Sequence, residues 1–296
     1  MTELRLGIIG LSPGNGHPYS WSAIFNGYNP VEMAKCPFPA IPAYLAGRNF
    51  PRDAIPGAKV THVWTQDPSM SSRIAAAARI PNVADQIGDM IGNVDAVLLA
   101  RDDAENHEKF AAPFLDAGLP IYIDKPLALS VDAAQRLYAL QRRQGQIFTC
   151  SALRYAREFQ ITAADRTELG DIIYVDACAP KDWDTYAIHV IEPLLAIVGQ
   201  DATALTSHGG KTRHLDLRWP SGTTGRITTL GTENSPFVLR IFGKNGWRRL
   251  EFSDTFSAFR LALAAYLDIV RGTAPPQDPS GPLAVVRMIE SGRNSP

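Results

Sequence analysis

Short apolar segments alternate with helix-like segments along the first half of the chain, and this alternation restricts the possible folds more than any other feature. The strand-like segments are residues 4–10, 59–65, 94–100 and 120–124. Gly118 follows one of the helix-like segments, at the position where helices commonly end. Apolar runs linked by helices are typical of parallel strands that are buried on both faces. The sequence therefore predicts an α/β domain over residues 1–125, with a doubly wound parallel sheet.

The pattern changes after Gly145, where strand-like segments follow one another. Turn signals such as Pro220-Ser221-Gly222 join several of them as hairpins. Residues 126–296 are therefore expected to form an α+β domain with an open-faced, largely antiparallel sheet. A helix over 130–144 can pack on either domain, and further helices are expected at 155–167, at 188–198 and twice at the end of the chain. The expected strands are 146–151, 171–179, 202–207, 212–219, 223–230, 237–242 and 248–252.

The composition excludes several classes of protein. A formal net charge of −1 gives no basic surface of the kind that binds nucleic acid or anionic lipid. Apolar runs such as residues 96–100 are too short to span a bilayer, and the first residues show no signal-peptide pattern. Cys36, Cys150 and Cys178 are odd in number and widely spaced, so neither a disulfide framework nor a metal site is expected. We expect a cytoplasmic protein without nucleic-acid or membrane partners.

Residues 29–57 are unusual because they contain six prolines. We expect this segment to be mostly loop, with one short helix. A loop of this length in a compact domain is usually functional or forms an interface.

Glycines follow the first predicted strand. Gly10, Gly14 and Gly16 lie between that strand and a helix that Pro18 opens, while Ser12 stands where a G-x-G-x-x-G motif has its second glycine. A dinucleotide site needs glycines here because the chain turns tightly and the pyrophosphate approaches backbone N–H groups. An ordinary turn is the alternative. The position between strand and helix favours a loop that binds NAD or NADP.

The end of the second predicted strand lacks the acidic residue that often binds a ribose hydroxyl. Thr65 stands there, and Asp67 two residues later either contacts the ribose or opens the next helix. No arginine is near in sequence to hold a 2′-phosphate, so the choice between NAD and NADP stays open. Arg101 follows the third buried strand and is expected beside the cofactor, or alternatively in a solvated turn.

The sequence Asp124-Lys125-Pro126 ends a predicted strand at the edge of the sheet where α/β proteins bind ligands. With the run Val94–Ala100 and with His107 before it, this stretch resembles the glucose–fructose oxidoreductase/inositol dehydrogenase/rhizopine catabolism (Gfo/Idh/MocA) family. The resemblance continues through Arg154-Tyr155, through Gly170–Ile173 and through His189–Glu192. It implies a Rossmann domain followed by an open-faced α+β domain, and a homo-oligomer, dimeric or tetrameric.

The resemblance further implies an oxidoreductase that moves a hydride between a nicotinamide and a hydroxyl-bearing carbon of a sugar, sugar derivative or polyol. Lys125 and His189 would flank the reacting hydroxyl, and Asp124 and Pro126 would lie beside the cofactor. His189 is suited to act as the base because imidazole titrates near neutrality. Plain alternatives are a salt bridge for Lys125 and a helix-start hydrogen bond for His189.

The chain departs from the family pattern in four places. The glycine loop is atypical, Asp124 replaces a glutamate, the proline-rich segment is long, and Thr185 stands where the family has an aspartate four residues before the histidine. Asp184 is therefore the candidate that orients His189, unless it only caps a loop. Arg154, Asp182, Trp183 and Tyr186 form a polar and aromatic set that suits a hydroxyl-rich ligand, although Arg154 can equally be a solvated surface residue.

Two other functions remain open from the sequence. The departures around the glycine loop and Thr185 allow a cofactor-binding regulator or scaffold without turnover. The same residues also allow a reductase of a non-sugar small molecule.

Overall fold

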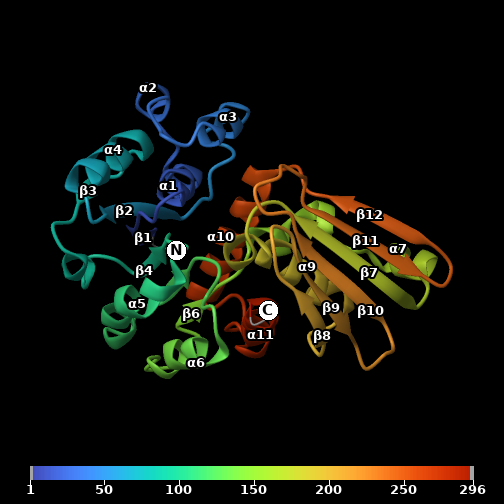
Figure 1. Cartoon of the computed structure of the whole chain (residues 1–296). Coiled ribbons are helices and arrows are strands. Elements are labelled where there is room, and N and C mark those ends of the chain that lie inside the picture. The colour runs from blue at the N-terminus through green and yellow to red at the C-terminus, as the bar shows by residue number, and fades with distance from the viewer. Residues whose placement is uncertain (1–2, 294–296) are drawn as a thin grey trace. The chain divides into compact units, whose positions relative to one another are not determined.

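The computed structural model describes residues 3–293. The chain divides into two compact units, each described here by itself. The first unit comprises residues 1–124, 135–149 and 263–277, and the second comprises residues 125–134, 150–262 and 278–296. Both contain one six-stranded sheet (Figure 1).

The sheet of the first unit is parallel throughout, with strand order β3-β2-β1-β4-β5-β6. The last four residues of β1 and all of β4 are buried, as their continuous apolar sequences predict. This confirms the predicted doubly wound α/β fold. The strands are β1 (Leu4–Ile9), β2 (Ala58–Trp64), β3 (Asn82–Val83), β4 (Ala96–Leu99), β5 (Ile121–Ile123) and β6 (Ile147–Phe148).

The helices of the first unit begin where local sequence supplies a cap. Asp67 accepts a hydrogen bond from the backbone N–H of Ser69 at the start of α4. Of the two roles considered for Asp67, ribose contact and helix capping, the structure shows helix capping. Asn29 caps α2 in the same way, and the proline-rich segment holds two short helices where one was expected. The elements are α1 (His17–Asn26), α2 (Pro30–Met33), α3 (Ala40–Ala46), α4 (Pro68–Ala78), η1 (Ile87–Met90), η2 (Ala104–Asn106), α5 (His107–Asp116) and α6 (Val131–Ala139).

Residues 135–149 and 263–277 group with the first unit. The sequence allowed the helix over 130–144 to pack there, but residues 263–277 were expected in the second domain. Tyr266 explains one of them. Its ring lies 5.6 Å from those of Tyr122 and Phe148, and its hydroxyl donates to the carbonyl oxygen of Val97 at 3.1 Å. Burying this large ring against β4, β5 and β6 stabilises the sheet, and hydropathy patterns do not reveal such a long-range contact.

The sheet of the second unit has the strand order β12-β11-β7-β10-β9-β8. Strands β7 and β10 are parallel and all other neighbours are antiparallel, which confirms the predicted mixed, largely antiparallel sheet. The strands are β7 (Ile172–Ala179), β8 (Thr203–His208), β9 (Arg213–Arg218), β10 (Thr224–Thr229), β11 (Val238–Gly243) and β12 (Trp247–Glu251).

Helix α9 (Ile188–Val198) has the predicted bounds and packs on β7 and β11. The helix expected at 155–167 is instead two short 3₁₀ turns followed by a later helix, because Thr162 caps that helix together with Asp165. The remaining elements are η3 (Ala152–Tyr155), η4 (Arg157–Phe159), α7 (Ala163–Leu169), α8 (Trp183–Tyr186), α10 (Thr255–Val270) and α11 (Ser280–Arg293).

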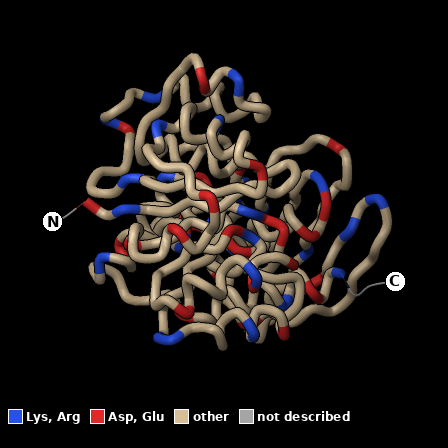
Figure 2. The backbone as a smooth tube through the Cα atoms, turned by 90° about the vertical axis from the view of Figure 1, so that its left-hand side faces the viewer, with Lys and Arg blue, Asp and Glu red and all other residues tan. Residues whose placement is uncertain are grey.

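The two faces of this second sheet differ in chemistry. Leu215, Ile227 and Ile241 are buried on the face that α9 and α11 cover. The other face carries ion pairs between neighbouring strands, Arg226 with Asp216 and Arg240 with Asp176. Charges of both signs are interspersed along the chain (Figure 2). Within residues 3–293, no helix is long and apolar enough to cross a membrane, and no cluster of three metal-ligating side chains occurs.

Candidate active site

The glycine loop joins β1 to α1 and is tightly packed at two of its glycines. A Cβ atom at Gly10 would lie 2.3 Å from Pro18, and one at Gly16 would lie 2.6 Å from the ring of Phe38. Gly14 has a φ of +80° and no neighbour within 4 Å of the Cβ position. Gly10 and Gly16 therefore fix the path of the loop, and Gly14 leaves its outer side accessible to a ligand.

Ser12 ties the glycine loop to the end of β4. Its hydroxyl donates to Asp102 Oδ1 at 2.6 Å and accepts the backbone N–H of Asp102 at 3.1 Å. Ser12 is buried, so the side chain that replaces the usual second glycine serves as a link between two loops.

Gln66 and Arg101 make a second link at this edge of the sheet. The Gln66 amide exchanges two hydrogen bonds with the backbone of Leu11, at 3.2 and 2.7 Å. Arg101 Nη1 donates to Gln66 Oε1 at 2.9 Å, and the guanidinium also pairs with Asp103. An arginine thus does lie at the end of β2, contrary to the expectation from sequence distance. Arg101 lies in the loop that follows β4. Gln66 was not among the site residues predicted from the sequence.

Thr65 does not present its hydroxyl to a ligand. The hydroxyl donates to the carbonyl oxygen of Asp67 at 2.7 Å and lies 2.9 Å from the hydroxyl of Ser71. Thr65 therefore shapes the turn into α4, and its hydroxyl is not directed at a cofactor, contrary to what the sequence had suggested.

Asp124 holds the far end of the glycine loop. Its carboxylate, with 1% of the side chain exposed, accepts from Asn15 Nδ2 at 2.9 Å and lies 2.5 Å from His17 Nδ1. The His17 ring is stacked on Trp21 at 5.1 Å. Loops from β1, β2, β4 and β5 are therefore linked by side chains before any ligand binds.

In the second unit, Tyr186 lies between two lysines and His189. Lys125 Nζ lies 5.7 Å from the centre of the Tyr186 ring, and the His189 ring lies 5.5 Å from it. Lys181 Nζ donates to the Tyr186 hydroxyl at 2.5 Å. Phe237 lies 5.2 Å from His189 and adds an aromatic wall that the sequence analysis missed. Lys125 is buried, 5% exposed, and Pro126 beside it is buried as well.

Ser151 orients His189. The Ser151 hydroxyl lies 2.8 Å from His189 Nδ1, and the Ser151 backbone N–H donates to Glu192 Oε2 at 2.5 Å. Glu192 is 3% exposed and pairs with Arg154 at 3.4 Å. Burial raises the pKa of Glu192 to about 7, although the Arg154 charge and the Ser151 N–H act in the opposite direction. Arg154 is thus held by Glu192 and is not simply a solvated residue.

Three predicted residues have other partners. Asp184 pairs with Arg293 at 3.0 Å, whereas the side chain that contacts His189 Nδ1 is Ser151. Asp182 caps α8 through the backbone N–H of Thr185. The Trp183 indole is buried and donates to the carbonyl oxygen of Ile289, so it packs α11 and is not available as a substrate platform.

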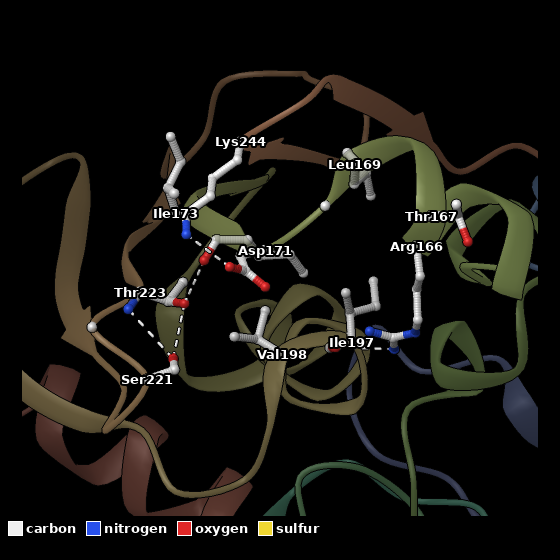
Figure 3. A pocket seen from close by; sticks show the side chains of 13 residues that line it. Arg166, Thr167, Leu169, Asp171, Ile173, Ile197, Val198, Ser221, Thr223 and Lys244 are labelled. Carbon is white, nitrogen blue, oxygen red and sulfur yellow. Dashed lines mark hydrogen bonds and ion pairs between the residues drawn. The ribbon is translucent and has the colours of Figure 1, made fainter.

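One cavity of the second unit does not coincide with these residues. It measures about 810 Å³ and lies at one end of the second sheet, between α7, the end of α9 and the β9–β10 turn (Figure 3). The polar groups drawn there bond to one another, as Lys244 does with Asp171 and Ser221 with Thr223. A second cavity of about 600 Å³ is bordered by Lys181, Asp182 and Asp184. Because Lys181 also binds Tyr186, this smaller cavity adjoins the candidate site.

Comparison with known proteins shows which proteins this chain is similar to. Residues 43–151 match the model of the GFO_IDH_MocA family, described as an oxidoreductase family with an NAD-binding Rossmann fold. Inositol 2-dehydrogenase 2 of Saccharopolyspora erythraea is 28% identical over 212 residues, which cover 66% of this chain and 62% of that protein. The matched region thus spans less than two thirds of this curated relative.

Solved structures of similar fold cover nearly the whole chain. Apo scyllo-inositol dehydrogenase from Lactobacillus casei superimposes with a TM-score of 0.73 at 15% identity, over 98% of this chain and 96% of that one. GenD2 from gentamicin A biosynthesis, solved in complex with NAD, gives a TM-score of 0.71 at 18% identity, over 100% and 94%. At such identities these likenesses establish the two-part fold.

Proposed function

We propose that the chain belongs to the Gfo/Idh/MocA family and is an NAD(P)-dependent dehydrogenase, because residues 43–151 match the model of this oxidoreductase family with an NAD-binding Rossmann fold. Its substrate is a sugar, sugar derivative or polyol, and the reaction oxidises a CH–OH group or reduces the corresponding carbonyl. The observation that carries the proposal is the placement of Lys125 and His189 against the same Tyr186 ring, with His189 oriented by Ser151.

The residues of the first unit fit a dinucleotide. Gly14 leaves space where a pyrophosphate approaches the backbone, and Gln66 and Arg101 border the end of β2 where the adenosine ribose binds in this fold. When bound, the nicotinamide accepts the hydride that leaves the substrate carbon, or returns it in the reverse direction. The neutral amide of Gln66 does not repel a 2′-phosphate, so both NAD and NADP are accepted.

The residues of the second unit handle the proton. In the oxidation, the hydroxyl proton passes to His189 while the C–H electrons leave as hydride, and a carbonyl forms. The Lys125 ammonium holds the oxygen and stabilises its negative charge as the proton leaves. The Tyr186 and Phe237 rings offer apolar faces to the C–H side of a ring-shaped polyol, which supports this substrate class.

Steady-state turnover of a panel of polyols and sugars, with NAD and NADP in turn, tests the function. A Lys125→Met variant that binds the cofactor but has lost turnover is the expected result. Absence of binding by NAD, NADH, NADP and NADPH in a calorimetric titration would remove the dehydrogenase proposal.

A scaffold without turnover is the second candidate, and one observation favours it. The carboxylates of Asp102 and Asp124 bond to the glycine loop, near the place where an anionic pyrophosphate would bind. Such a protein would bind the cofactor weakly and show no turnover of any polyol.

We further propose that the protein self-associates through the open face of its second sheet. Trp247 is 63% exposed there and extends a row formed by Phe242 and Tyr174 on neighbouring strands. Leu215, Leu217, Ile227 and Ile241 are buried within the chain, so the contact uses this aromatic row and the surrounding ion pairs. A mass near 32.3 kDa by light scattering at micromolar concentration would count against it.

A further inference from the structure

The strongest unexplained feature of the second unit is a buried polar chain beneath His189. It runs from His189 Nδ1 to the Ser151 hydroxyl, and from the Ser151 backbone N–H to Glu192 and Arg154. Glu192 follows His189 by three residues on α9, one turn along the same helix. His189 and Glu192 thus both lie on α9, while Ser151 comes from the segment between β6 and η3 and Arg154 from η3 itself.

A buried carboxylate is costly unless its partners compensate for the lost water. Here Glu192 accepts one short hydrogen bond from a backbone N–H and pairs with a single guanidinium. An apolar side chain at this position would pack α9 without that cost. The buried Glu192 is therefore better explained by its hydrogen bond to the backbone of Ser151, which holds Ser151 in place.

We propose that Ser151 is a positioning residue for His189 and that Glu192 fixes Ser151 in place; this inference rests on the proposed dehydrogenase function. The Ser151 oxygen accepts a hydrogen bond from the protonated Nδ1 of His189. In the neutral ring, Nε2 then carries the free electron pair and exchanges the proton with the substrate hydroxyl. Ser151 orients the His189 ring, a role that the sequence predicted for Asp184.

The geometry allows this assignment. A serine oxygen has two acceptor positions, and the N–H of Leu153 occupies one at 3.2 Å. The second is available to His189 Nδ1 at 2.8 Å. Nε2 lies across the ring from Nδ1, on the side directed away from Ser151.

The experiment is a long-range ¹H–¹⁵N correlation spectrum of the full-length protein labelled at histidine, recorded above the pH at which His189 loses its charge. His189→Gln assigns the signals. We expect Nδ1 of the wild-type ring to carry the proton and Nε2 to be unprotonated. In Ser151→Ala the Nε2–H form should increase, and in Ser151→Thr the wild-type pattern should return. Ser257→Ala, which removes a hydroxyl that caps α10 by bonding to Asp254, is the control.

Two outcomes overturn the inference: a wild-type ring protonated at Nε2, or a ring whose protonation pattern is the same in Ser151→Ala. The wild-type measurement needs no variant, so a poorly folding Ser151→Ala does not remove the test. Once a substrate is known, Ser151→Ala should lower kcat by roughly 10²-fold or less, with KM nearly unchanged. If the spectra are as expected but no substrate is turned over, the proposed function fails and the positioning role stands.

Discussion

His17 Nδ1 lies 2.5 Å from Asp124 Oδ2, and this contact joins the glycine loop to the residue that precedes Lys125. Asn15 donates to the same carboxylate oxygen at 2.9 Å. The acidic residue of the Asp-Lys-Pro sequence therefore holds the glycine loop through two of its side chains.

Asp124→Asn should weaken dinucleotide binding. The neutral amide oxygen is a weaker acceptor for His17 and Asn15 than the carboxylate oxygen, because a hydrogen bond to a charged group is worth about 1.5–3 kcal/mol and one between neutral groups about 0.5–1.5 kcal/mol. We expect NAD affinity, measured by calorimetric titration, to fall by roughly tenfold or more. Asp171→Asn, at an exposed carboxylate paired with Lys244, is the matched control. Equal affinity in both variants would show that the loop does not depend on Asp124.

His189→Ala should lower kcat by roughly 10²–10⁴-fold, the usual contribution of a positioned acid–base group, while cofactor affinity stays unchanged. Lys125→Met should reduce turnover comparably. His208→Ala is the control, since that ring lies on β8 beside His214. Wild-type kcat in His189→Ala would make Tyr186 the next candidate for the base.

Asp184→Asn should leave kcat nearly unchanged. Its carboxylate pairs with Arg293 at a site where both side chains are more than a third exposed, and such pairs contribute little. Steady-state kinetics beside the Ser151→Ala variant checks this. A larger loss in Asp184→Asn than in Ser151→Ala would return the orienting role to Asp184.

Glu192 should make stability depend on pH. Because its pKa is about 7 in the folded protein, above the ordinary value of 4.5, the native state holds a proton that the unfolded chain releases between these values. The favourable contribution is complete below about pH 4.5 and is lost as pH rises through 7, by at most about 3 kcal/mol. Urea unfolding at several pH values should give Glu192→Gln a flatter profile. An unchanged slope would contradict this origin.

Gly16→Ala should destabilise the first unit by about 1–3 kcal/mol, because the new methyl group would overlap Phe38 and Ile41. Gly88→Ala is the control, since no atom lies within 4 Å of its Cβ position. Chemical denaturation of both variants gives the comparison. Equal stability would mean that the segment 38–41 moves away at little cost.

The sequence by itself determined most of the secondary structure and carried the resemblance to a family of oxidoreductases. Burial on both faces of a parallel sheet requires continuous apolar runs, so β1 and β4 are visible in the chain. The bounds of α9 follow from a helical pattern that Gly199 ends. The Asp-Lys-Pro sequence and His189 indicated the candidate site because a motif of adjacent residues can be read directly from the sequence.

Only the tertiary structure decided which side chains meet. Ser151 and His189 are 38 residues apart, and Leu11 and Gln66 are 55 apart. The sequence separation of either pair does not predict the contact. Asp184, adjacent in sequence to the expected position, bonds instead to Arg293. Periodicity reports whether a residue is buried, whereas its partner depends on how separate elements pack, and that packing places Ser151 beneath the proposed base.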